Sequence, residues 1–229
     1  MNRKKIKLSL FLLSISILFF LSCKYIVGAN KSKNTICIDI GHGGYDPGAV
    51  VGENLEKDIT LKAGLTIGMY LEETGYNVVY TRKDDESLDT NKTKDMHKRL
   101  KVINSNHLLY ISIHANIYTN KIPHGTQCFY KKNDLESEKL ASSIQKMVKI
   151  FDKTNTRFEK SITGKFLIEN ANTTGCIVEL GFMTNKDDLT KMTDEKELNR
   201  LCLYIYMGIL DYLENRWKNE RTNTKSYWR

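Results

Sequence analysis

Short apolar runs of strand length alternate with longer segments of helical spacing from residue 35 onward in this chain of 229 residues. The first strand is predicted at Thr35–Ile40, and a strongly apolar one at Leu108–His114. Between them a helix is predicted from about Glu56 to Thr74, with Gly75 as its C-terminal cap. This alternation favours an α/β fold, in which helices flank both faces of a twisted, mixed but mostly parallel sheet.

The remaining elements continue the same alternation. Strands are predicted at Tyr76–Thr81, at Gly125–Tyr130, around Lys165–Ile168 and at Gly175–Leu180. Helices are predicted at about 94–104, at 133–152 and from Asp194, which forms a capping-box-like start with Glu197. The chain has two prolines and no internal repeat or low-complexity linker. We therefore expect one compact domain.

The first 29 residues have the pattern of a targeting segment. A basic start precedes the apolar run Leu8–Leu21, which is shorter than the roughly 20 residues of a membrane-spanning helix. Three interpretations are open: a signal peptide cleaved after Ala29, a lipoprotein signal with Cys23 as the modified residue, and an uncleaved anchor. All three predict that residues 30–229 are exported, either secreted or membrane-anchored outside the cytoplasmic membrane.

The net charge of +8 is concentrated at the two ends of the chain. Residues 1–29 contribute +5 and residues 217–229 contribute +3, so the body at 30–216 is neutral. A neutral body does not suit binding to a nucleic-acid backbone, and no nucleic-acid partner is expected. The sequence divides into the targeting segment 1–29, a domain at 30–216 and a basic polar tail at 217–229, which we expect to be solvated and partly disordered.

A glycine-rich stretch, GHGGYDPG, directly follows the first predicted strand. Such loops often bind phosphate groups, but Asp46 stands where the dinucleotide-binding pattern G-x-G-x-x-G requires its third glycine. No Walker lysine follows either. The phosphate-binding interpretation therefore fails, and His42 within the stretch requires another explanation.

Polar side chains that can bind metal occur at the ends of several predicted strands. His42 follows the first strand, His114 ends a second, Glu179 lies near the end of a third, and Glu56 begins the first helix. The carboxyl ends of parallel strands meet at one edge of the sheet, where functional groups gather. Two histidines and a carboxylate suit zinc with one open position, as in catalytic sites. The spacing itself, 14 and 58 residues between successive ligands, also permits a set of unrelated polar strand ends.

Four segments then supply a resemblance to a known family. They resemble the four motifs of the zinc-dependent N-acetylmuramoyl-L-alanine amidases of the amidase_3 type, and the resemblance covers residues 35–213. In chain order, the four segments are GHGGYDPGA, LEKDITL, YISIHAN and IVELGFMTN. These enzymes hydrolyse peptidoglycan. The resemblance implies that His42, Glu56 and His114 bind one zinc ion and that Glu179 is the catalytic acid/base. It also implies cleavage of the amide between the lactyl group of N-acetylmuramic acid and L-alanine of the stem peptide.

Two more residues are candidates for supporting roles. Asp39 lies in an otherwise apolar strand, where it would either orient His42 or make a structural hydrogen bond. Asn116, two residues after His114, would either touch substrate or hold its loop. Glu53 is a rival to Glu56 as ligand, but the LEKD context favours Glu56.

A single catalytic domain behind a targeting segment, with no attached wall-binding module, resembles the spore-cortex, germination-specific subgroup of this family. That resemblance implies removal of stem peptides during muramic δ-lactam formation in sporulation, in the intermembrane space of the forespore. It also suggests a partner protein at the membrane surface that recruits or activates the enzyme. The alternatives are a general autolytic or cell-separation amidase and a non-catalytic peptidoglycan-binding scaffold.

Overall fold

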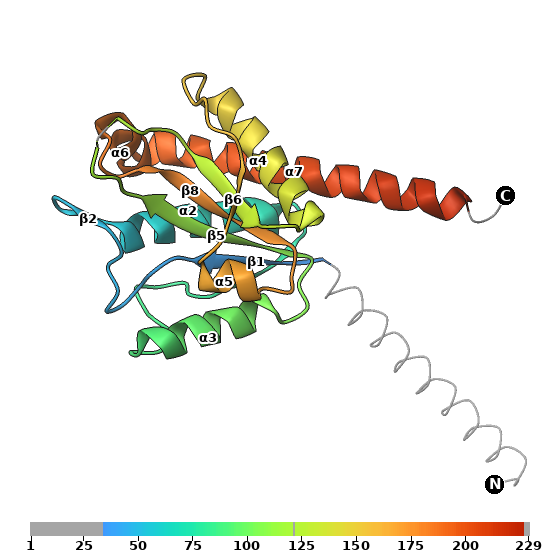
Figure 1. Ribbon diagram of the computed structural model, residues 1–229, viewed down its shortest axis with the longest axis horizontal. Helices are drawn as coiled ribbons and strands as arrows, with labels where there is room; N and C mark the ends of the chain where they lie inside the picture. The colour runs from blue at the N-terminus through green and yellow to red at the C-terminus, as the bar shows by residue number, and fades with distance from the viewer. Residues whose placement is uncertain (1–33, 121, 227–229) are drawn as a thin grey trace, which may run out of the picture.

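The computed structural model describes residues 34–120 and 122–226 (Figure 1). Six strands form a sheet in the order β4-β1-β5-β8-β6-β7, and β2 and β3 form a separate hairpin. Within the large sheet, neighbouring strands are parallel except for β6 and β8. The strands are β1 (Thr35–Ile40), β2 (Val50–Val51), β3 (Asn54–Leu55), β4 (Asn77–Tyr80), β5 (Leu109–Asn116), β6 (Gln127–Lys131), β7 (Lys160–Ile162) and β8 (Gly175–Phe182).

Helices cover both faces of this sheet (Figure 1). On one face, α2, α4 and α7 pack over the large hydrophobic core, and on the other face α3 and α5 pack over a smaller one. The predicted α/β fold with a mixed, mostly parallel sheet is thus confirmed. The helices are α2 (Glu56–Glu73), α3 (Lys92–Ile103), α4 (Leu135–Phe151), α5 (Phe166–Asn170), α6 (Lys186–Thr193) and α7 (Glu195–Ser226).

The alternation of side chains along the central strands separates the large core from a polar face. In β5, Ile111 and Ile113 belong to the large core, whereas Tyr110 belongs to the smaller core under α3 and α5. Successive side chains of a strand point to opposite faces, so Ser112 and His114 share the face of Tyr110. Polar groups therefore gather on the α3/α5 face without interrupting the large core.

The predicted strand around Lys165–Ile168 is wrong, because this segment begins helix α5. Gly164 has a φ of +77° and turns the chain, and the backbone N–H of Glu169 then donates to the carbonyl of Lys165 at 3.0 Å. A short apolar run fits a buried strand and one turn of helix equally well, so its pattern cannot distinguish them. The strand of this region is instead β7, which lies just before the turn at the edge of the sheet.

The C-terminal part contains more helix than predicted. Helix α6 was not predicted, although the Asn185 side chain caps it by accepting from the N–H groups of Asp187 and Asp188. Asp194 caps the start of α7, as predicted, by accepting from the N–H of Glu197 at 2.9 Å. Helix α7 continues to Ser226, through most of the segment expected to be a partly disordered tail.

The predicted targeting segment 1–29 lies outside the described residues, and the division of the chain at residues 29 and 216 stays a prediction. Within the described part of the chain, no helix combines the length and the apolar character that a membrane span requires.

Candidate metal centre

His42 lies in the loop after β1 in a backbone conformation that is uncommon for residues other than glycine, with a φ of +60°. Two arginines, which we call the arginine clamp, hold this loop. Arg82 donates to the carbonyl of Gly41 at 3.0 Å, and Arg99 donates to the carbonyl of Ile40 at 2.6 Å and to that of His42. Three consecutive carbonyl groups are therefore fixed by buried guanidinium groups, and His42 is held facing the sheet edge.

Glu56 is the first residue of α2 and is 5% exposed. Its Oε2 accepts from the N–H of Ala49 at 2.8 Å, and its Oε1 accepts from the N–H of Ala115 at 3.0 Å. Burial raises the pKa of Glu56, but hydrogen bonds from His114 and His42 bring it well below its usual range. The carboxylate is thus fixed in its ionised form between α2 and β5.

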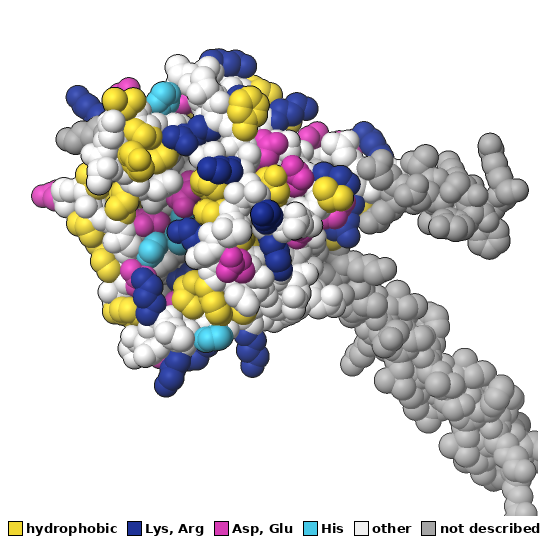
Figure 2. Space-filling model, viewed as in Figure 1, with side chains coloured by type: hydrophobic (Ala, Val, Ile, Leu, Met, Phe, Trp, Pro, Cys, Tyr) yellow, Lys and Arg dark blue, Asp and Glu magenta, His cyan; other side chains and the backbone are white. Residues whose placement is uncertain are grey.

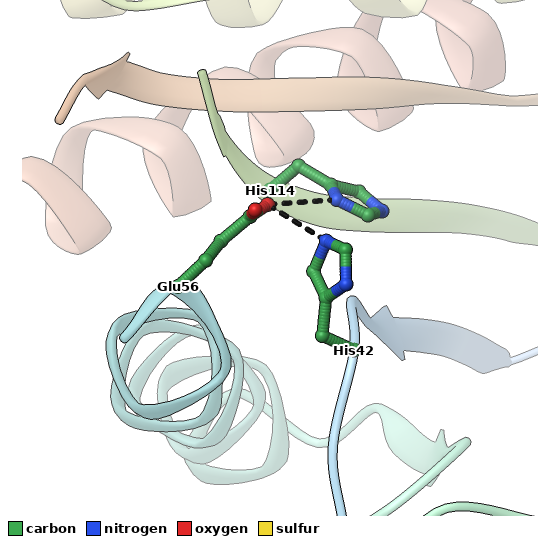
Figure 3. Close-up of side chains that lie close together, drawn as sticks. All are labelled: His42, Glu56 and His114. Atoms are coloured by element: carbon green, nitrogen blue, oxygen red, sulfur yellow. Dashed lines mark hydrogen bonds and ion pairs between the residues drawn. The ribbon is translucent and has the colours of Figure 1, made fainter. Parts of the chain in front are cut away.

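The side chains of His42, Glu56 and His114 point toward one another (Figure 3). Oε1 of Glu56 lies 3.0 Å from Nε2 of His42 and 3.1 Å from Nδ1 of His114. One ligand atom from each residue lies within 4.8 Å of the others. Two imidazole nitrogens and a carboxylate oxygen at this separation match the donor set that zinc takes in catalytic sites. The three residues that the sequence selected are thus brought together and fit a metal ion.

Two features around these three side chains support the same interpretation. Oδ2 of Asp46 lies 3.1 Å from Nδ1 of His42, so a carboxylate adjoins the ring nitrogen that does not face Glu56, although the two atoms do not form a hydrogen bond in this arrangement. Gly48, with a φ of +67°, leaves no room for a side chain, since a Cβ there would lie 2.7 Å from Cβ of Glu56 and 2.8 Å from Cδ2 of His42. The loop is therefore shaped closely around both side chains.

Glu179 lies beside this group on β8, where it is the register partner of His114. Its Oε2 is buried and has no hydrogen-bond partner among the described residues. Burial raises the pKa of Glu179 above its usual value, and the neighbouring Glu56 carboxylate acts in the same direction, while His114 opposes it. A carboxyl group with a raised pKa and a free oxygen is suited to accept and return a proton.

A cleft of about 230 Å³ opens over these residues, between the polar face of the sheet and helices α3 and α5. His42, His114 and Glu179 line one side, and Met96, Phe166 and Leu167 line the other. Figure 2 shows histidine, acidic and basic side chains close together on this face of the molecule. The cleft therefore combines polar and charged groups with apolar side chains from α3 and α5.

The supporting residues differ in their placement. Asp39 is fully buried and contacts Arg99 at 3.0 Å and Ser112 at 2.6 Å, so it reaches His42 through the arginine clamp and not through the imidazole. Oδ1 of Asn116 accepts from the N–H of Ile117 at 2.8 Å, which holds the loop after β5. Glu53 is exposed in the hairpin between β2 and β3.

Sequence reasoning missed two residues of this site. The first is Asp46, whose position four residues after His42 could have indicated a contact with the imidazole. The second is Lys165, which lines the cleft although the sequence pattern places it in a strand and indicates no role for it.

Comparison with known proteins gives a consistent result. The family described as N-acetylmuramoyl-L-alanine amidase matches residues 36–211. The germination-specific N-acetylmuramoyl-L-alanine amidase of Bacillus subtilis is 37% identical over 232 residues, covering 93% of this chain and 98% of the relative.

Solved structures agree with this match. The CwlD amidase of Clostridioides difficile, determined in complex with the GerS lipoprotein, superposes with a TM-score of 0.74 at 34% identity, over 79% of this chain and 98% of that one. The catalytic domain of CwlV, an amidase of Bacillus (Paenibacillus) polymyxa, gives a TM-score of 0.70 at 28% identity, over 79% and 98% of the two chains.

Proposed function

The chain belongs to the N-acetylmuramoyl-L-alanine amidase family, and on that premise we propose that it removes stem peptides from the peptidoglycan of the spore cortex. The bond cleaved is the amide between the lactyl group of N-acetylmuramic acid and L-alanine. The similarity to a relative named as germination-specific, over nearly the whole of both chains, supports the cortex over a general autolytic role. Peptide-free muramic acid is the product required for δ-lactam formation.

One zinc ion is the cofactor of this proposal, held by His42, Glu56 and His114. The observation that carries the proposal is the convergence of these three side chains beside Glu179, from four separate segments of the chain. A non-catalytic scaffold would not need this complete set. When bound, zinc would polarise the scissile carbonyl and lower the pKa of a coordinated water molecule, so that hydrolysis can proceed at neutral pH.

The protein's own groups then carry the proton transfers. Glu179 accepts a proton from the attacking water through its unpartnered oxygen and returns it to the leaving nitrogen of alanine. The raised pKa of Glu179 favours the first of these steps, because a carboxylate with a higher pKa is a stronger base. Asp46 lies beside Nδ1 of His42, the ring nitrogen that faces away from Glu56 and the proposed zinc position.

The proposed location is outside the cytoplasmic membrane, in the intermembrane space of the forespore, and the partner is the peptidoglycan itself. A protein at the membrane surface that recruits or activates the enzyme is a further part of this proposal. It is supported by the Clostridioides difficile structure, in which the related amidase is in complex with a lipoprotein.

The test is mass spectrometry of cortex peptidoglycan digested by the full chain with zinc, with Glu179→Ala alongside. We expect free peptides that begin with L-alanine from the wild type and none from the variant, which should still take up zinc. If the wild type releases glycan fragments with their peptides attached, the proposed bond is wrong. If Glu179→Ala cleaves at the wild-type rate, the assigned role of Glu179 is wrong.

A further inference from the structure

Two of the Lys and Arg side chains that line the cleft are paired with carboxylates. Arg99 is paired with Asp39 at 3.0 Å and with Asp95 at 2.8 Å, and Lys92 lies 3.6 Å from Asp46. Lys165 also lines the cleft, and among the described residues it has no ion pair. Its charge does act on the neighbouring Glu179, where it opposes the effect of burial on the pKa of that carboxyl group.

The segment that carries Lys165 is anchored on both sides. Glu169, the carboxylate one helical turn further on, accepts from the N–H of Gly164 at 2.6 Å. The ring of Phe166 packs against His97 with the centroids 4.9 Å apart, and Leu167 is buried in the smaller core. Lys165 is thus an exposed ammonium group on a fixed turn, and it lines the same cleft as Glu179.

The proposed role of Glu179 indicates which part of a bound substrate would lie near Lys165. Glu179 returns a proton to the leaving nitrogen, so that nitrogen must lie within hydrogen-bond reach of its carboxyl group. The peptide that departs with this nitrogen therefore extends from Glu179, and the glycan extends from the other side of the scissile carbonyl. Phe166 and Leu167 offer an apolar surface for the methyl group of alanine.

We propose that Lys165 binds a carboxylate of the stem peptide, on the residue that follows L-alanine, and so selects acidic peptides. This proposal rests on the proposed amidase function and adds a specificity-determining residue to it. An ammonium group without an ion partner attracts a carboxylate, and a partly exposed pair of this kind contributes modest binding energy. The expected effect is therefore a preference among substrates rather than a requirement for cleavage.

The test is a competition between two peptidoglycan fragments that differ at one group. One carries glutamate after alanine with its α-carboxylate free, and the other carries the corresponding carboxamide, isoglutamine. The zinc-loaded full chain digests an equal mixture, and the ratio of released peptides gives the ratio of kcat/KM. We expect the wild type to prefer the carboxylate about fivefold, which corresponds to about 1 kcal/mol.

Three variants distinguish the effect of the Lys165 charge on substrate preference from an effect on the structure of the protein. Lys165→Met should reduce the preference to about one by raising KM for the carboxylate fragment, whereas Lys165→Arg should retain it. Lys92→Met, which alters a lysine already paired with Asp46, is the matched control and should keep the preference. All three should melt close to the wild-type temperature, because both lysines are exposed.

The outcomes that contradict the proposal differ from those that contradict the function. A wild type that cleaves both fragments equally, or a Lys165→Met variant that keeps the preference, overturns the role of Lys165 and leaves the amidase intact. A wild type that releases no alanine-terminated peptide from either fragment, or from cortex peptidoglycan, overturns the proposed function itself.

Discussion

Replacing Arg99 with methionine tests whether buried charge, rather than loop sequence alone, holds His42 in place. The guanidinium group is 4% exposed and contacts two carboxylates, those of Asp39 and Asp95, and two carbonyls, those of Ile40 and His42. Arg99→Met keeps much of the aliphatic volume and removes all four contacts. The fully buried Asp39 then retains Ser112 as a partner but loses its neutralising charge.

The loss in the free energy of unfolding can be estimated from these contacts. Removing one partner of a buried ion pair typically costs about 3–5 kcal/mol, because it leaves an uncompensated charge. For a domain of this size, that lowers the melting temperature by roughly 6–20 °C. The left-handed conformation of His42 also loses the hydrogen bond from Arg99 to its carbonyl, so weaker zinc binding should accompany the loss of stability.

The loss of stability in Arg99→Met should also depend on pH, in a direction that follows from the pKa of Asp39. Burial alone would raise the pKa of Asp39, but Arg99 and Ser112 hold it below its usual value. In the wild type the ionised carboxylate therefore contributes stability above the unfolded pKa of about 3.9, and this is lost as pH falls through the lower folded value. In Arg99→Met, burial dominates and the folded pKa rises. The stability deficit of the variant should then shrink as pH falls from 7 to 5.

The assay is urea denaturation of both proteins in the presence of chelator at the two pH values, since bound metal would add its own stabilisation. Arg200→Met is the control, because Arg200 makes an exposed pair with Glu197 and should cost no more than about 1 kcal/mol. The reasoning is refuted if Arg99→Met costs less than the control, or if its deficit grows on acidification.

Three further predictions use matched positions of the same chain. Glu56→Gln should abolish zinc uptake, measured by metal analysis, whereas Glu53→Gln in the exposed hairpin should leave it unchanged; equal uptake by both variants would contradict the assigned ligand. Gly48→Ala should weaken zinc binding in a metal titration, because its Cβ would meet His42 and Glu56, whereas Gly52→Ala also has a positive φ but no atom within 4 Å and should keep its zinc affinity. Ser112→Ala should lower the free energy of unfolding by about 1.5–3 kcal/mol in urea, because it removes a 2.6 Å hydrogen bond to the buried Asp39 carboxylate; a change below about 0.5 kcal/mol would contradict this.

The large-scale organisation could be predicted because it depends on periodicity. The apolar runs of β1, β5 and β8 are long enough to be recognised as buried strands, and their order in a parallel sheet brings His42, His114 and Glu179 to one edge. Glu56 could be placed with them because it begins the helix that follows the loop. The convergence of these side chains was thus a consequence of topology.

The errors came from short or polar elements, in which local pattern is weak. Strand β7 has three residues, and only its pairing with β6 identifies it as a strand. Helix α5 has five residues and depends on the turn at Gly164, which brought Lys165 to the cleft. The contact of Asp39 with Arg99 joins residues 60 positions apart, and no spacing rule indicates it.

The arrangement of charged side chains on one face of the sheet explains how this face holds the His42 loop in place and also carries a carboxyl group that can exchange a proton. Side-chain alternation places Asp39, Ser112, His114 and Glu179 on the face covered by α3 and α5. Deep in this face, Asp39 is neutralised by Arg99, whose remaining hydrogen bonds fix the carbonyls on either side of Gly41. At the open end, Glu179 has no compensating partner on its buried oxygen among the described residues. Because the two carboxylates have opposite pKa shifts, one stays ionised to hold the loop while the other remains able to exchange a proton. The paired carboxylate thus holds the loop, and the unpaired one is left available for the proton transfers proposed for it.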